Sequence, residues 1–259
     1  MSGERVTLAR RDALVAIAAL GPLAACGAPA ARPATPAPAP PPPQPPSPAM
    51  PAPVALAGNH QPIALPFPAG SLRGISEGLI TSHHQKNYGG AVKNLNRVEQ
   101  ELSHVTAETP PFVVAALRER ELTFRNSKAL HEAYFANLGG SGKRGGAIET
   151  ALGQAYGTSA RWEEHFRATG LGLGGGSGWV VLAMELDTGA LRTTAAGNHT
   201  QALASGAPLL VMDMYEHAYQ MDHGAEVAKY VEAFFANVQW DEVNRRLERA
   251  QKAATALRA

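Results

Sequence analysis

The residues of this chain that could do chemistry are mainly histidines and one acidic run near the C-terminus. Nine histidines and a single cysteine are present, and the run 213–219, Asp-Met-Tyr-Glu-His-Ala-Tyr, is dense in metal-binding residue types. If Asp213 and His217 converge with His83 and His131, they supply three imidazoles, one carboxylate and no thiolate. Such hard and borderline donors suit a redox-active first-row metal such as iron or manganese. A structural zinc site would be expected to use cysteine, and the only cysteine lies far away at position 26.

Each of these residues also has a simpler interpretation. A single histidine on a helix is more often packed or solvated than bound to a metal, and an Asp followed four positions later by a His is a weak pattern alone. Four other histidines lie outside any pattern that indicates chemistry, and we interpret them as non-functional: His60, His104, His165 and His223. The pattern around each candidate ligand therefore decides its interpretation.

Two of the candidate ligands lie on predicted helices. Apolar periodicity predicts a long helix that is capped by Ser76, contains His83 and is interrupted at Gly89-Gly90. A second helix is predicted to begin at Pro110-Pro111, because proline is favoured in the first turn of a helix. These elements predict a helical N-terminal region.

The third predicted helix, residues 126–138, contains His131 and ends at Gly139-Gly140. The stretch that follows, to Gly146, is rich in glycine and lysine, which is typical of a boundary between domains. We therefore predict an N-terminal helical domain at residues 58–145 and a C-terminal domain at residues 146–259.

The C-terminal half mixes helices and strands. The predicted elements are helices 148–156 and 159–169, strands 179–186 and 190–194 around the turn 187–189, strand 209–212, and helices 229–238 and 242–259, the last capped by Asp241. The third strand would deliver Asp213 at its end. This order predicts an α+β fold, in which a helical hairpin domain precedes a small antiparallel sheet flanked by helices.

The N-terminus has the layout of an export signal. Basic residues precede a short apolar stretch, residues 13–25, which is too short to span a bilayer. The stretch ends in Leu23-Ala24-Ala25-Cys26, which resembles the lipobox of bacterial lipoproteins and makes Cys26 the expected lipid anchor. An ordinary signal peptide with an incidental cysteine is the alternative. Arg10-Arg11 resembles a twin-arginine signal, and Sec export stays open. We predict a signal peptide at residues 1–25 and an exported, periplasmic or cell-surface protein anchored to a membrane through its lipid.

Residues 26–57 are predicted to form a tether. Residues 28–57 contain 13 of the 20 prolines, and such a segment runs as extended polyproline II at roughly 3 Å per residue, reaching up to about 90 Å. Removing residues 1–25 takes away three of the 23 basic and two of the 22 acidic side chains, which leaves a formal charge of zero. This balance argues against a nucleic-acid partner.

Five motifs occur in an order that resembles a known family. They are Ile75-Ser76-Glu77-Gly78-Leu79 with His83-His84, then Leu130-His131-Glu132-Ala133-Tyr134-Phe135, Gly176-Ser177-Gly178-Trp179, the 213–219 run, and Asn237-Val238-Gln239-Trp240-Asp241-Glu242. Together they look like the iron/manganese superoxide dismutase family over about residues 60–250. The resemblance implies that His83, His131, Asp213 and His217 bind one iron or manganese ion per subunit. It also implies superoxide as substrate and a homodimer.

The resemblance gives three further side chains a part in the reaction. Glu216 matches the glutamate that orients the last histidine ligand of the neighbouring subunit. Trp179 matches the aromatic residue packed against the metal pocket. His199 lies where relatives place a Gln or His that hydrogen-bonds the metal-bound solvent, whereas Ser127 stands where iron members commonly place such a Gln.

The chain also departs from the family pattern. Asn87 stands where the family has a gateway His, Ala91 where it has a channel Tyr, and Gln220 where it has an interface Tyr. A bulge near Gly89-Gly90 could let the Tyr88 hydroxyl replace the missing phenol.

Three functions stay open from the sequence. The first is a membrane-tethered superoxide dismutase that uses iron or manganese. The second is a dismutase-fold metal-binding lipoprotein with weak or altered activity, which the absent gateway residues favour. The third is a helical interaction module on a stalk, which requires the four-ligand match to be accidental. The sequence does not distinguish iron from manganese.

Overall fold

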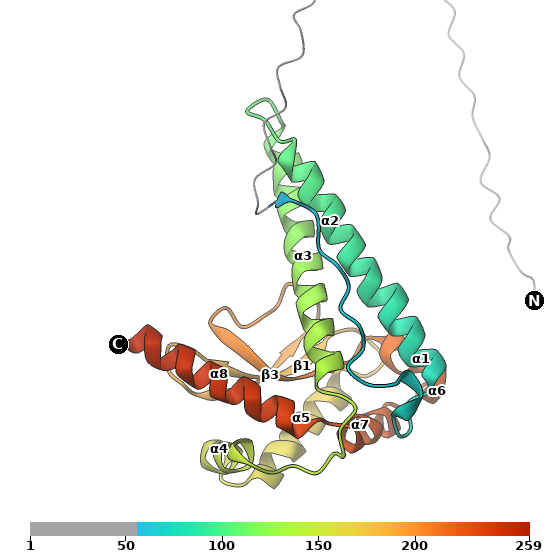
Figure 1. The fold of residues 1–259 in the computed structure, drawn as a ribbon, viewed down its shortest axis with the longest axis vertical. Helices are drawn as coiled ribbons and strands as arrows, with labels where there is room; N and C mark the ends of the chain where they lie inside the picture. The colour runs from blue at the N-terminus through green and yellow to red at the C-terminus, as the bar shows by residue number, and fades with distance from the viewer. Residues whose placement is uncertain (1–55) are drawn as a thin grey trace, which may run out of the picture. The chain divides into compact units, whose positions relative to one another are not determined.

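Two long antiparallel helices extend from a body that consists of a small sheet and other helices (Figure 1). The computed structural model describes residues 56–259. The hairpin consists of α2 (Gly89–Ser103) and α3 (Pro111–Ala136), and the segment before α1 (Glu77–Ser82) runs along it. None of the helices that the structure describes is long and apolar enough to cross a membrane.

The first predicted helix forms with a change of type inside it. Ser76 caps α1 as predicted, because its Oγ accepts a hydrogen bond from the Leu79 N–H at 3.1 Å. Residues His83–Tyr88 (η3) then form a π-helix, and the regular α-helix resumes at Gly89 as α2. The irregularity therefore lies just before Gly89-Gly90, and it begins at the first candidate ligand. π-Bulges are frequent at functional sites.

The predicted second and third helices are one element. α3 runs unbroken for 26 residues, so the prediction of a break between them was wrong. The stretch 118–125 contains no Gly or Pro, and Glu121 forms ion pairs with Arg118 at 2.8 Å and Arg125 at 3.0 Å on the same helix. Strong helix formers and such pairs carry a helix through a region without an apolar pattern.

The sheet has three antiparallel strands in the order β2-β1-β3. They are β1 (Trp179–Glu185), β2 (Leu191–Ala196) and β3 (Gly206–Asp213). The predicted hairpin is confirmed, and the pairing of Trp179 with Asp213 places both at the same end of the sheet. The α+β prediction is therefore confirmed.

Five α-helices complete the C-terminal half. They are α4 (Ala147–Tyr156), α5 (Ser159–Leu173), α6 (Gln220–His223), α7 (Val227–Ala236) and α8 (Trp240–Arg258). The predicted cap of the last helix was wrong, because α8 begins before Asp241 and its N-cap is Gln239. Asp241 instead lies in the first turn, where its carboxylate interacts favourably with the helix dipole. The domain boundary after residue 145 falls between α3 and α4 and stays a prediction.

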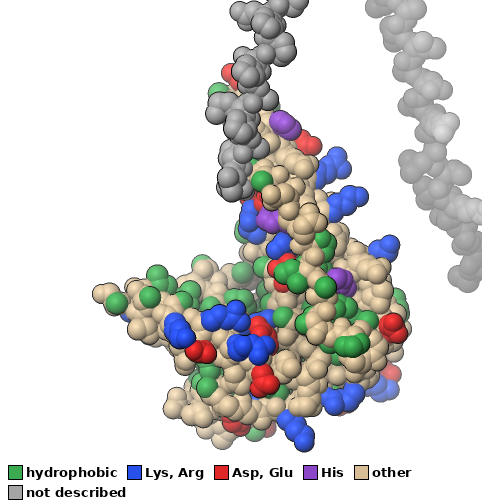
Figure 2. Space-filling model, in the orientation of Figure 1, with side chains coloured by type: hydrophobic (Ala, Val, Ile, Leu, Met, Phe, Trp, Pro, Cys, Tyr) green, Lys and Arg blue, Asp and Glu red, His purple; other side chains and the backbone are tan. Residues whose placement is uncertain are grey.

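Charges of both signs are interspersed on the surface. Figure 2 shows basic and acidic side chains side by side over α8, where Glu242 forms ion pairs with Arg245 at 2.8 Å and Arg246 at 2.9 Å. Opposite charges on one helix face offset each other, in keeping with the balanced composition of the chain.

Candidate metal centre

The structure brings all four predicted ligands together. One ligand atom from each of His83, His131, Asp213 and His217 lies within 4.8 Å of the other three. His83 begins the π-helix, His131 lies on α3, Asp213 is the last residue of β3, and His217 lies in a short 3-10 helix, η4 (Glu216–Ala218). The first three are buried, and the His217 side chain is 27% exposed. Four separate elements therefore converge on one point.

Asp213 is the centre of this cluster. Its Oδ2 lies 3.0 Å from Nε2 of His83, 3.3 Å from Nε2 of His217 and 3.6 Å from Nε2 of His131. Within residues 56–259, the buried His131 Nε2 has no hydrogen-bond partner. A buried nitrogen without a partner is costly in a folded protein, and a metal ion bound at this point would satisfy it. Imidazole and carboxylate donors without a thiolate fit iron or manganese.

The backbone sets the orientation of His131. Its Nδ1 lies 2.7 Å from the carbonyl oxygen of Ser127, one helical turn earlier. A carbonyl can only accept a hydrogen bond, so Nδ1 carries the proton and the Nε2 lone pair faces the cluster. Ser127 thus contributes to the site through its backbone.

Asp213 is held on both its side chain and its backbone. The Tyr215 N–H donates to its Oδ1 at 2.9 Å, and the buried Tyr230 hydroxyl donates to its carbonyl oxygen at 2.6 Å. These contacts leave Oδ2 pointing at the histidines. Outer groups of this kind orient metal ligands.

The electrostatics favour the forms that bind metals. Burial lowers the pKa of His83 and lowers that of His131 to about 3, against the opposing charge of Asp213. Burial alone would raise the pKa of Asp213, but hydrogen bonds from His217 and His83 outweigh it and lower the pKa below its usual range. Buried imidazoles therefore stay neutral beside an ionised carboxylate.

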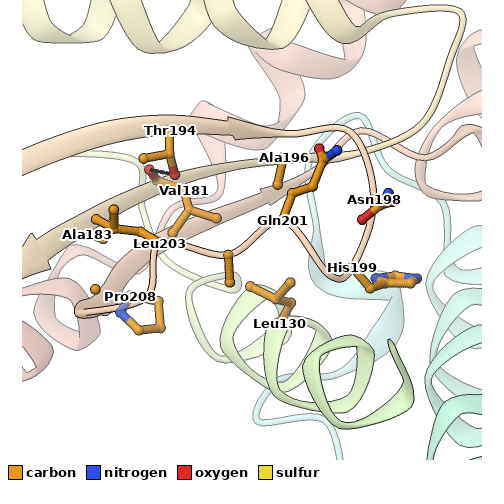
Figure 3. Close-up of a pocket in the computed structure, with 12 residues that line it drawn as sticks. Leu130, Val181, Ala183, Thr194, Ala196, Asn198, His199, Gln201, Leu203 and Pro208 are labelled. Carbon is orange, nitrogen blue, oxygen red and sulfur yellow. Dashed lines mark hydrogen bonds between the residues drawn. The ribbon is translucent and has the colours of Figure 1, made fainter. Parts of the chain in front are cut away.

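His199 and Trp179 are linked beside the ligands. The Trp179 indole N–H donates to His199 Nδ1 at 2.9 Å, so the proton of a neutral His199 lies on Nε2. Burial lowers the pKa of His199, which favours that neutral form. The His199 ring lies 6.3 Å from the His131 ring. Figure 3 shows His199 on the loop after β2, where it lines a small apolar pocket of about 60 Å³ with Leu130 and Leu203.

Tyr88 does not take the position of the missing channel phenol. Its hydroxyl donates to Glu132 Oε1 at 2.8 Å and accepts from the Ile63 N–H at 2.7 Å. The π-helix forms as a bulge, but Tyr88 uses its hydroxyl to fasten the N-terminal segment to α3. Ala91, which stands at the position of that phenol, is buried.

Glu216 lies on the surface beside the ligand His217. It is exposed, and it lines a shallow pocket of about 250 Å³ together with Tyr219, Gln220 and Val227. Its contact with a second subunit stays a prediction. Cys26, the predicted signal peptide and most of the predicted tether lie outside the described residues.

Sequence reasoning missed Tyr215, Tyr230 and Asn126. Tyr215 lies inside the conspicuous 213–219 run and could have been singled out there. Asn126 donates to the His199 carbonyl oxygen at 2.7 Å across 73 positions of sequence, and Tyr230 contacts Asp213 across 17 positions. No local pattern marks contacts of that kind.

The chain is similar in sequence to known superoxide dismutases. Residues 144–246 match the family described as iron/manganese superoxide dismutases, C-terminal domain. An iron superoxide dismutase of Cupriavidus metallidurans is 46% identical over 170 residues, which are 65% of this chain and 86% of that protein. A manganese superoxide dismutase of Halobacterium salinarum is 31% identical over 180 residues, 68% and 88% of the two chains. An iron superoxide dismutase of Aquifex aeolicus is 30% identical over 197 residues, 73% and 91% of the two chains.

Proposed function

We propose that this chain, which belongs to the iron/manganese superoxide dismutase family and is a superoxide dismutase, works with one iron or manganese ion held by His83, His131, Asp213 and His217. The family prediction made from the sequence motifs is confirmed. The observation that carries the proposed ligand set is the convergence of four ligand atoms around Asp213, with the buried His131 Nε2 unpartnered among the described residues.

The chain's own groups set up the reaction at this point. A bound iron or manganese ion supplies one-electron redox chemistry, by which one superoxide becomes dioxygen and a second takes up two protons and leaves as hydrogen peroxide. Three neutral imidazoles and one carboxylate leave a trivalent site with a net positive charge, which attracts a small anion. His217 is the most exposed of the four ligands, so the anion is expected to approach from its side.

His199 is proposed to act as the hydrogen-bond donor near the reacting anion. Because Trp179 donates to its Nδ1 at 2.9 Å, its Nε2 carries a proton and is free to donate. Trp179 is proposed as the residue that positions this donor.

We also propose a homodimer through the surface around Glu216. Glu216 and Gln220 are exposed beside His217, and Met221 is 65% exposed on the same segment. An exposed apolar side chain next to charged and amide groups is typical of a subunit interface. Glu216 is proposed to contact the last histidine ligand of a second copy.

The proposed location rests on sequence alone. Residues 1–25 are proposed to direct export, Cys26 to carry a lipid, and residues 26–57 to tether the enzyme at a periplasmic or cell-surface membrane. Superoxide is an anion that crosses bilayers poorly, so the enzyme would act on superoxide formed on its own side of the membrane. Labelling of the full chain with a radioactive fatty acid, and its loss in Cys26→Ala, tests this location. An unlabelled wild-type chain would contradict the lipid anchor.

The second candidate function is a metal-binding lipoprotein of the same fold with weak or altered activity. Asn87 and Ala91 replace the gateway residues, and the Tyr88 hydroxyl is bound to Glu132 and Ile63. The experiment is to load the full chain with manganese or iron, measure metal content, and follow superoxide decay by stopped flow. Fast catalysed decay by metal-replete protein supports the dismutase. A metal-replete chain that does not accelerate decay favours the second candidate.

A further inference from the structure

Tyr215 contacts the metal site in several ways, although none of the roles above uses its side chain. Its backbone N–H donates to Asp213 Oδ1. Its ring lies nearly parallel to the His199 ring, at 4.8 Å and 17°, and to the His217 ring, at 5.3 Å and 15°. One phenol ring therefore stacks on both the proposed proton donor and a proposed ligand.

The ring also reaches the residue that holds the donor. It lies 5.9 Å from the Trp179 ring, and Trp179 donates to His199 Nδ1 at 2.9 Å. The Tyr215 ring therefore packs against His199, against its partner Trp179 and against the proposed ligand His217.

The loop that carries His199 needs such contacts. Asn198 and Gln201 are exposed, and the segment from Gly197 to Ser205 lies between β2 and β3 without regular structure. Asn126 holds the His199 carbonyl oxygen at 2.7 Å, and Trp179 holds its Nδ1 at 2.9 Å. Tyr215 joins the His199 ring directly to the ring of the ligand His217.

We propose that Tyr215 is a positioning residue, which fixes the His199 imidazole relative to His217 so that the His199 Nε2–H points at the anion-binding side of the metal. The inference rests on the proposed function of the site. Small errors in the placement of a donor lower the rate of the step that uses it without preventing binding. Loss of Tyr215 should therefore lower kcat more than it changes KM or metal content.

Two substitutions separate the ring from the hydroxyl. Tyr215→Phe keeps the stacked ring and removes the hydroxyl, whereas Tyr215→Leu keeps an apolar side chain and removes the stacking. Aromatic pairs of this kind correspond to roughly two- to tenfold effects. Tyr219→Phe is the matched control, because Tyr219 is a buried neighbour whose hydroxyl accepts from the Gly175 N–H at 3.2 Å.

The experiment uses the full chain loaded with manganese, and it measures metal content, the visible absorption spectrum of the bound Mn(III), kcat and KM. Each variant is expected to bind one equivalent. Tyr215→Phe keeps the stacking and should match the parent chain, as should Tyr219→Phe, whereas Tyr215→Leu should shift the spectrum and lower kcat about tenfold with an unchanged KM.

Two results would overturn the proposal. One is a Tyr215→Leu protein that keeps the parent spectrum and kcat. The other is a Tyr215→Leu protein that loses its metal, because Tyr215 would then only fill space. The spectra are informative even if the loaded parent chain does not dismutate superoxide, so this failure differs from a failure of the proposed function.

Discussion

Acid should destabilise the metal-free protein well before its carboxylates titrate. Burial lowers the pKa of His131 to about 3 in the folded chain, whereas its ordinary value is 6.5. Between these two values the unfolded chain binds a proton that the folded chain does not. Stability is therefore full above pH 6.5 and falls as the pH drops toward 3.

The size of this effect follows from the width of the interval. One proton costs about 1.4 kcal/mol per pH unit, so the free energy of unfolding should fall by about 2 kcal/mol between pH 6.5 and pH 5. The pKa of His83 is also lowered by burial, which makes the slope steeper. Asp213 adds nothing in this window, because the ordinary pKa of an aspartate, 3.8, lies below it.

The assay is urea unfolding of the metal-free full chain at several pH values from 7.5 to 5. His131→Asn removes one titrating group and should make the slope shallower. A free energy of unfolding that stays constant between pH 6.5 and 5 would refute the reasoning, because the buried histidines would then not resist protonation.

Two further substitutions test the framework around the site by thermal unfolding. Arg144 donates to Glu149 and Glu163, both at 2.6 Å, and these carboxylates are partly solvated. Arg144→Met should therefore lower the free energy of unfolding by only about 1–2 kcal/mol. An unchanged Tm would show that the ion pairs of Arg144 contribute nothing to stability. The fully buried Asn137 accepts a hydrogen bond from the Val211 N–H at 2.9 Å and so joins the end of α3 to β3. Asn137→Ala should lower the free energy of unfolding by about 2–3 kcal/mol, because it leaves that buried N–H unpaired. A decrease below about 0.5 kcal/mol would contradict this reasoning.

Features set by neighbouring residues could be predicted from the sequence. The residue types Asp187-Thr188-Gly189 favour a tight turn by themselves, and the structure places a hairpin there. Apolar strand residues before Asp213 place that carboxylate at the end of β3. Ser76 caps α1 through its own side chain.

Features set by distant contacts could not be predicted in this way. The same apolar spacing fits an α-helix and the π-helix at His83–Tyr88, so the choice depends on packing. The Tyr88 hydroxyl is bound by Glu132, 44 positions away, and its partner decides that it cannot serve as the channel phenol. The proposed role of Tyr215 likewise depends on its ring contact with His199, on a loop whose conformation only the tertiary structure defines.

The most direct test of the central claim is the metal content of the full chain purified from its own host, measured together with superoxide dismutation. We expect about one equivalent of iron or manganese per chain and fast dismutation. His131→Ala and His217→Ala should lose both, while His165→Ala, at an exposed histidine outside the site, should keep both. A His131→Ala protein that retains a full equivalent of metal and full activity would contradict the claim that these four side chains form the metal site.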